Sequence, residues 1–229
     1  IIFLSINTLY FCAMIQNKDS AFKIAEILLQ VKAVKLQPNN PFTWASGWKS
    51  PIYCDNRVTL SYPAARTHIR QAFSEVIVQK FGKPDVIAGV ATGGIPQGVL
   101  IAQELGIPFI YVRSAAKGHG MGNMVEGAYE KGQRVVVVED LISTGGSSLK
   151  AVESLKEAGL DVRGLAAIFT YGFKVAQDSF KKAGCPFITL TDYSVLIEQA
   201  LKSNYISQND LNHLQNWRDN PSEWMQTAE

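Results

Sequence analysis

Two adjacent carboxylates, Glu139 and Asp140, follow a run of valines and precede a loop rich in glycine, serine and threonine, residues 141–147. The glycines of the loop would let backbone N–H groups surround an anion. A helix that begins near residues 144–147 would point its positive end at the same place. The loop lacks the lysine of a Walker A loop and the glycine spacing of a dinucleotide fingerprint. It therefore predicts a cradle for a single phosphate.

The two carboxylates need another partner, because they would repel a phosphate. Carboxylate oxygens accept hydrogen bonds, which suits neighbouring sugar hydroxyls, and their charge favours positive charge that develops on a sugar ring. A phosphorylated ribose satisfies the cradle and the carboxylates together. The alternative is a glycine-rich turn with solvated acids.

Strand and helix patterns alternate around this motif. Long runs of β-branched residues predict buried parallel strands, and the pattern as a whole predicts an α/β fold with a mostly parallel twisted sheet flanked by helices. Outside the alternation we expect a helix with Ser20 as its N-cap, a helix ended by Gly82, and a terminal helix or extension from Leu201. The expected strands cover about 85–91, 108–113, 134–140, 162–171 and 186–190, with helices at 94–106, 144–159 and 172–184.

Residues 114–132 interrupt the alternation, with four glycines within residues 118–127. A loop of this length in a compact domain is either a solvated connector or a functional lid. Lys117 and His119 follow the C-terminal end of a strand, which is the edge where open α/β sheets bind ligands. This position favours a lid.

Composition bounds the class of protein. The chain has 229 residues, 47% hydrophobic and 18% charged, with a net charge of +2, which fits one globular domain and does not favour nucleic-acid binding. Three scattered cysteines fit the reducing cytoplasm. The apolar stretch 1–15 is shorter than a membrane span and lacks the cationic start of a signal peptide. We therefore expect residues 1–13 to be an upstream or non-native extension, residues 14–229 to be a single domain, and the protein to be cytoplasmic, with no membrane association.

Three segments resemble a known family. VVVVEDLISTGGSS, residues 135–148, resembles the phosphoribosyl-pyrophosphate (PRPP) signature of type I phosphoribosyltransferases. NPFTWASGWKSPIYCDNR, residues 40–57, resembles the N-terminal segment of orotate phosphoribosyltransferases, and YVRSAAKGHGMGNMVEG, residues 111–127, their mobile catalytic loop. The resemblance covers 42–193. It implies the type I phosphoribosyltransferase fold, with a small N-terminal hood at about 36–60 and a mobile loop at about 114–127.

The family transfers a phosphoribosyl group from PRPP to orotate in pyrimidine biosynthesis, and the resemblance implies a role for each matching residue. The acids would bind the ribose hydroxyls, and Lys117 and Asp140 would be catalytic. Arg113, Lys117 and His119 would hold pyrophosphate in the site of the neighbouring subunit of a homodimer. Mg²⁺ would arrive with PRPP, held by the ligand's oxygens rather than by a protein metal site. The implied PRPP-binding stretch is Glu139, Asp140, Leu141, Ile142, Ser143, Thr144, Gly145, Gly146 and Ser147, in which residues 144–147 take the 5-phosphate and Ser143 also contacts orotate.

The sequence departs from the family pattern at several positions. Many members carry lysine where this chain has Ala45, Gly93 and Ser114. We therefore expect a greater reliance on Lys117. The arginine that binds orotate in the family is not evident in IFTYGFK, so Lys49 and backbone amides are the candidates for holding the orotate carboxylate.

Other functions fit the sequence less well. A transferase for a purine or uracil is the nearest, and residues 42–57 argue against it. A PRPP-sensing regulator would be expected to lose lid residues or to gain a DNA-binding domain, whereas this lid keeps its lysine and histidine. A bifunctional enzyme with a fused decarboxylase is not favoured, because it would need the length of a second domain in addition to these 229 residues.

Overall fold

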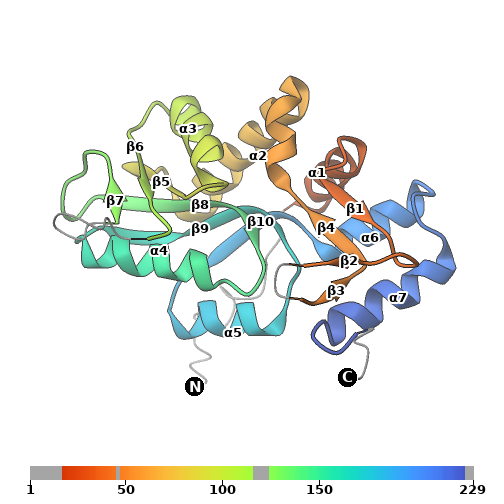
Figure 1. The fold of residues 1–229 in the computed structure, drawn as a ribbon. Coiled ribbons are helices and arrows are strands. Elements are labelled where there is room, and N and C mark those ends of the chain that lie inside the picture. The colour runs from red at the N-terminus through yellow and green to blue at the C-terminus, as the bar shows by residue number, and fades with distance from the viewer. Residues whose placement is uncertain (1–16, 45–46, 116–123, 225–229) are drawn as a thin grey trace, which may run out of the picture.

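A computed structural model of the chain describes residues 17–44, 47–115 and 124–224. Residues 1–13, the expected extension, lie outside this part of the chain. At the centre is a six-stranded sheet with the order β10-β9-β8-β5-β6-β7 (Figure 1). Neighbouring strands pair in parallel except at the edge, where β7 runs antiparallel to β6. The predicted mostly parallel sheet is confirmed. Its strands are β5 (Val86–Val90), β6 (Phe109–Val112), β7 (Val125–Glu126), β8 (Arg134–Ile142), β9 (Asp161–Thr170) and β10 (Phe187–Asp192).

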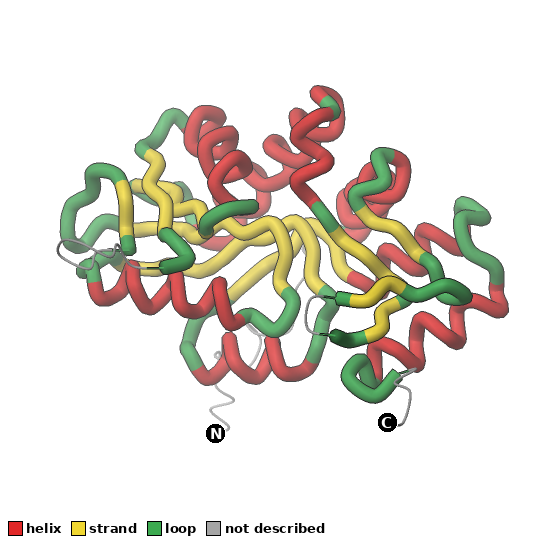
Figure 2. Tube along the Cα trace, in the orientation of Figure 1, coloured by secondary structure: helices red, strands yellow, loops and turns green. Residues whose placement is uncertain are grey.

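The valine run of β8 explains why helices cover both faces of the sheet (Figure 2). Successive side chains of a strand point to opposite faces. Val135 and Val137 pack with α4 (Gly146–Glu157) and α5 (Lys174–Lys182), whereas Val136 and Val138 pack in the core of the other face. All four valines are fully buried. That second face is covered by α1 (Lys18–Gln30), α2 (Pro63–Phe81) and α3 (Gly94–Leu105).

Two small antiparallel pairs of strands form the segment expected as the hood. β1 (Val34–Leu36) pairs with β4 (Ile52–Cys54), and β2 (Phe42–Thr43) pairs with β3 (Lys49–Ser50). A 3-10 helix, η2 (Asn56–Ser61), then leads into α2. We call residues 34–61 the hood from here on. It lies against the ends of β8 and β9, because Asn56 contacts Asp140 and the Trp44 ring contacts that of Tyr171.

The C-terminal helices hold the hood in place. They are α6 (Tyr193–Lys202) and α7 (Gln208–Asp219). Trp217 of α7 is fully buried, and its ring centroid lies between 5.5 and 5.7 Å from those of four other aromatic residues: Trp44, Tyr171, Phe173 and Tyr193. Helix α1, the first of the described helices, also depends on this part of the chain, since it packs against α6 and β10. The sequence predicted a terminal helix or extension here but not these partners.

Two local predictions were wrong. Helix α1 begins at Lys18, because the side chain of Asn17 accepts a hydrogen bond of 3.0 Å from the backbone N–H of Ser20. Asn17, not Ser20, is the N-cap. Strand β8 does not end at the acids but runs through Ile142, since residues 141–142 continue the pairing with β9. The predicted helix end at Gly82 is confirmed.

The described helices bear on one further expectation. None of those in residues 17–44, 47–115 and 124–224 combines the length and the apolar character needed to cross a bilayer.

Candidate active site

The loop between β8 and α4 is the one that the sequence predicts to be an anion cradle. Gly145 adopts a left-handed backbone with φ of 85°, and a Cβ there would lie 2.8 Å from the ring of Phe180, so the turn requires glycine. In the described chain no side chain caps α4. Its first backbone N–H groups, from Gly146 and Ser147 onward, are therefore free to bind an anion at the positive end of the helix.

The two carboxylates lie beside this cradle but differ in environment. Glu139 is 5% exposed and accepts hydrogen bonds from Ser148 Oγ at 3.3 Å and from the backbone N–H of Asp140 at 3.1 Å. Burial, reinforced by the charge of Asp140, raises the pKa of Glu139 well above its ordinary value. Burial also raises the pKa of Asp140, while a hydrogen bond from Glu139 and the charge of Arg57 oppose that rise. Of the two, Glu139 is therefore the more readily protonated and Asp140 the more readily ionised.

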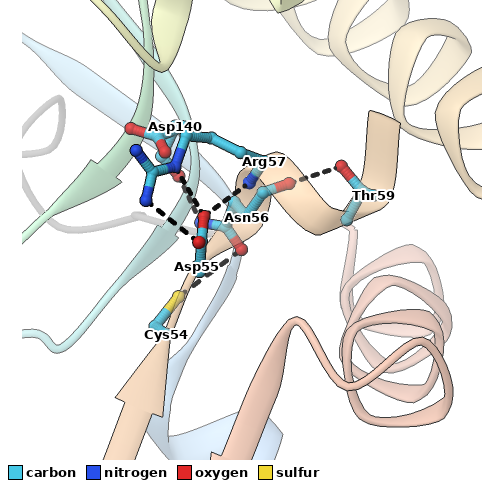
Figure 3. Close-up of polar contacts among 6 residues, drawn as sticks. All are labelled: Cys54, Asp55, Asn56, Arg57, Thr59 and Asp140. Atoms are coloured by element: carbon cyan, nitrogen blue, oxygen red, sulfur yellow. Dashed lines mark hydrogen bonds and ion pairs between the residues drawn. The ribbon is translucent and has the colours of Figure 1, made fainter. Parts of the chain in front are cut away.

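The hood contributes three side chains to the same place (Figure 3). Asn56 is 1% exposed, and its amide donates a 2.6 Å hydrogen bond to the backbone oxygen of Asp140. Arg57 donates from Nε and Nη2 to the two carboxylate oxygens of Asp55, at 2.7 and 2.9 Å. The guanidinium lies beside the Asp140 carboxylate. Asn56 thus fixes the backbone at the acids, and Asp55 fixes the arginine.

The turn between β5 and α3 completes the surroundings of Asp140. A Cβ at Gly93 would overlap the Asp140 carboxylate. Gly93 has helical angles, φ of −67° and ψ of −33°, which any residue can adopt. Glycine is therefore needed here for the close approach of the Asp140 side chain and not for the backbone conformation. Asp140 therefore fills a space that any other residue at position 93 would occupy.

Two adjoining cavities open at this edge of the sheet. The first, of about 390 Å³, is polar and holds both carboxylates. The second, of about 300 Å³, is walled by aromatic rings and shares Cys54 and Leu141 with the first. A larger cavity of about 490 Å³ between α6 and α7 lies away from the carboxylate pair. The first cavity is lined by Cys54, Asp55, Arg57, Ala91, Thr92, Gly93, Glu139, Asp140, Leu141 and Ser147. The second is lined by Thr43, Trp44, Tyr53, Cys54, Leu141, Ser143 and Tyr171.

The structure brings together most of the residues that the sequence singled out. Glu139, Asp140, Leu141 and Ser147 line the first cavity, and Ser143 lines the second. Thr144, Gly145 and Gly146 form the cradle, whereas the Ile142 side chain is buried in the core.

The basic residues expected to bind pyrophosphate are not gathered in this way. Arg113, at the end of β6, lines neither cavity and forms an ion pair of 3.5 Å with Glu126. Lys117, His119 and Ala45 lie outside the described residues.

Sequence reasoning gave no site role to several of the lining residues. Asp55 and Arg57 belong to a segment that resembles the family, but the resemblance implied no role for them. Tyr171 was predicted only as part of a strand. One signal was available for residues 91–93. They follow the strand next to β8, and the carboxyl ends of parallel strands meet at one edge of the sheet.

Glu139 should be a source of instability in the free protein. Its folded pKa lies above the ordinary value of 4.5, so folding favours the protonated form and stability falls as pH rises above the unfolded pKa. The glutamine side chain stays neutral across this pH range, so it carries no such cost. We expect Glu139→Gln to melt higher than the wild type near pH 8, by roughly 2–4 °C per kcal/mol gained, and to lose this advantage near pH 4. Scanning calorimetry at both pH values tests this; a variant that melts lower near pH 8 would contradict it.

Comparisons with known proteins agree with this geometry. Residues 60–198, more than half of the chain, match the family model described as phosphoribosyl transferase domain. An orotate phosphoribosyltransferase of Phocaeicola vulgatus is 57% identical over 200 residues, which cover 87% of this chain and 94% of that protein. A crystal structure of orotate phosphoribosyltransferase from Aeropyrum pernix superposes with a TM-score of 0.71 at 30% identity, over 80% of this chain and 99% of that one.

A structure of Leishmania donovani UMP synthase superposes with a TM-score of 0.74 at 29% identity. The match covers 88% of this chain but 43% of that longer one. High identity over most of both chains, the matched domain model and a cradle set beside paired carboxylates lead to one assignment. The chain is a transferase that belongs to the orotate phosphoribosyltransferase family.

Proposed function

We propose that the protein transfers the 5-phosphoribosyl group of PRPP to orotate, giving orotidine 5′-phosphate and pyrophosphate, as a cytoplasmic enzyme of pyrimidine biosynthesis. The observation that carries the proposal is one cavity that joins an uncapped helix N-terminus to a carboxylate pair, beside a second cavity walled by aromatic rings. The first matches a phosphorylated sugar and the second a planar heterocycle.

In the first cavity each group has a distinct role. The backbone N–H groups of residues 144–147 hold the 5-phosphate. Glu139 and Asp140 accept hydrogen bonds from the ribose hydroxyls. The negative charge of Asp140 then stabilises the positive charge that develops on the ring as the bond from C1 to pyrophosphate breaks and the bond to the orotate nitrogen forms. Burial strengthens this effect, because it excludes water from the charges.

In the second cavity the base lies between the rings of Trp44, Tyr53 and Tyr171, with Ser143 at its edge. Lys49 donates a 2.9 Å hydrogen bond to Thr43, a residue of the cavity wall. This position lets Lys49 reach a carboxylate at the rim of the cavity, in place of the arginine that the sequence lacks.

The remaining groups are supplied from elsewhere. Arg113 lines neither cavity of its own subunit. This supports a homodimer in which Arg113, Lys117 and His119 of one subunit bind pyrophosphate in the active site of the other. Lys150 of α4 donates to the backbone oxygen of Ser114 at 3.3 Å and so ties the base of this loop to the cradle helix.

Mg²⁺ fits the oxygen-rich cavity as an ion carried by PRPP. Among the described residues no cluster of three or more His, Cys, Asp or Glu forms a metal cage. Asp140, a hard oxygen donor at the cavity wall, is the residue available to it. When bound, Mg²⁺ neutralises charge on the diphosphate.

Assay of the purified protein with PRPP, Mg²⁺ and a panel of bases tests the proposal. We expect turnover with orotate, and kcat/KM at least about 100-fold lower with uracil, adenine and hypoxanthine, since a buried polar site rejects analogues that leave its groups unpaired. Equal turnover of uracil or of a purine would overturn the assignment of orotate.

A further inference from the structure

Arg57 is a cation in the first cavity that none of the roles above uses. It is the one lysine or arginine among the described residues that line this cavity. Its side chain is 60% exposed, so its charged end reaches the cavity space. Nε and Nη2 are bound to Asp55, while Nη1 has no hydrogen-bond acceptor within the described part of the chain. The arginine therefore presents a fixed fork with donors to spare.

The carboxylate of Asp55 accepts three hydrogen bonds from Arg57. Besides the two guanidinium bonds, it accepts the backbone N–H of Arg57 at 3.2 Å as the N-cap of η2. Asn56 then pins the same turn to the backbone of Asp140. The position of the guanidinium relative to Asp140 is thus set before any ligand arrives, which lowers the entropy lost on binding.

The shape of PRPP decides what Arg57 faces. Its 5-phosphate and its diphosphate are attached at opposite ends of the ribose, on C5 and C1. With the 5-phosphate at the cradle and the ring at Asp140, the diphosphate on C1 must occupy the part of the cavity lined by Arg57 and residues 91–93.

Gly93 of the β5–α3 turn supplies no cation next to Asp140, and a Cβ there would overlap the carboxylate in this arrangement. A cation at this corner has to come from another element. The hood supplies it, since the Arg57 guanidinium lies beside Asp140 (Figure 3).

We propose that Arg57 binds the leaving diphosphate of PRPP, with Nη1 donating to a diphosphate oxygen while Asp55 orients the guanidinium. This inference rests on the proposed function, because it uses PRPP as the ligand. Hydrogen bonds between a guanidinium and a phosphate oxygen are charge-assisted and stronger than neutral ones. Arg57 therefore stabilises the negative charge that grows on the leaving group.

The competing explanation is that Arg57 only braces the hood through Asp55. A matched control separates the two. Arg163 forms the same kind of pair with Asp161, two residues before it, at 3.2 Å and with side chains 48% and 50% exposed. That pair lies at the start of β9 and lines neither cavity.

The test is titration calorimetry of pyrophosphate with Mg²⁺, and separately of ribose 5-phosphate, on the wild type and on Arg57→Gln, Arg57→Lys and Arg163→Gln. We expect Arg57→Gln to weaken pyrophosphate binding by about 10- to 100-fold, Arg57→Lys to restore part of the loss, and both variants to bind ribose 5-phosphate within about twofold of the wild type. Arg163→Gln should change neither affinity. Melting temperatures confirm that each variant is folded.

Three outcomes overturn the inference: unchanged pyrophosphate affinity in Arg57→Gln, an equal loss for both ligands, or no pyrophosphate binding by the wild type. Because the readout is binding, it is separate from the test of function. A wild type that binds pyrophosphate through Arg57 but does not convert orotate would sink the proposed function and leave the role of Arg57 standing.

Discussion

Replacing Asp140 with asparagine is expected to lower kcat for PRPP and orotate by about 10²–10³, the usual cost of losing one preorganised electrostatic partner of the transition state. Asparagine keeps the size of the side chain, and the backbone oxygen of residue 140 can still accept the bond from Asn56. The fold should therefore remain intact. The loss should appear in kcat more than in KM, because the charge acts when the ring becomes cationic.

The pH dependence gives a second readout for the same variant. Burial raises the pKa of Asp140, and the ionised form is the active one. As pH is lowered, the activity of the wild type should therefore begin to fall at a higher pH than an ordinary carboxyl group would give. The activity that remains in Asp140→Asn should not show this fall. Asp178→Asn, at an exposed pair with Lys174 on α5, is the control. A folded Asp140→Asn enzyme with near-normal kcat would remove Asp140 from the mechanism.

Gly93→Ala is expected to impair catalysis about as severely as Asp140→Asn, although residue 93 carries no functional group. The backbone of Gly93 is helical, so alanine is tolerated locally. Its methyl group, however, would occupy the space of the Asp140 carboxylate. The carboxylate must swing away from the ribose position, and kcat/KM should fall by about 10²-fold or more. Steady-state kinetics and a melting curve measure the two effects separately.

A double-mutant cycle tests the cause. If Gly93→Ala acts by displacing Asp140, its effect should nearly vanish in an Asp140→Asn background where the charge is already gone, so that the two losses do not add. Fully additive losses would show that residue 93 acts independently of Asp140.

The parts of the site that could be predicted from the sequence are those encoded locally. The valines of β8, the acids and the glycine turn are contiguous, so one short stretch contains both the strand and the cradle. The alternation of Val135 and Val136 between two cores follows from the strand period alone.

The parts that were missed depend on tertiary contacts. Arg57 is far from Asp140 in the sequence, and the two meet because the hood folds onto the end of β8. The reason for Gly93 is a clash with a side chain 47 positions later, which no local pattern records. Trp217 was placed in the terminal segment, but its ring contact with Trp44 joins residues far apart in the sequence and is known only from the folded structure.

The packing of α1 against α6 and β10 has a consequence for the order in which the protein is made. Ile24 and Leu28 of α1 are fully buried in the finished molecule, but β10 and α6, which pack against this helix, are synthesised long after it. At 5–20 residues per second, the first helix waits roughly 10–30 s for these partners. During this interval its apolar face is open to chaperones or to other nascent chains. A chain that stops before Phe187 would carry the entire phosphate cradle, yet leave its first helix without the surface it covers.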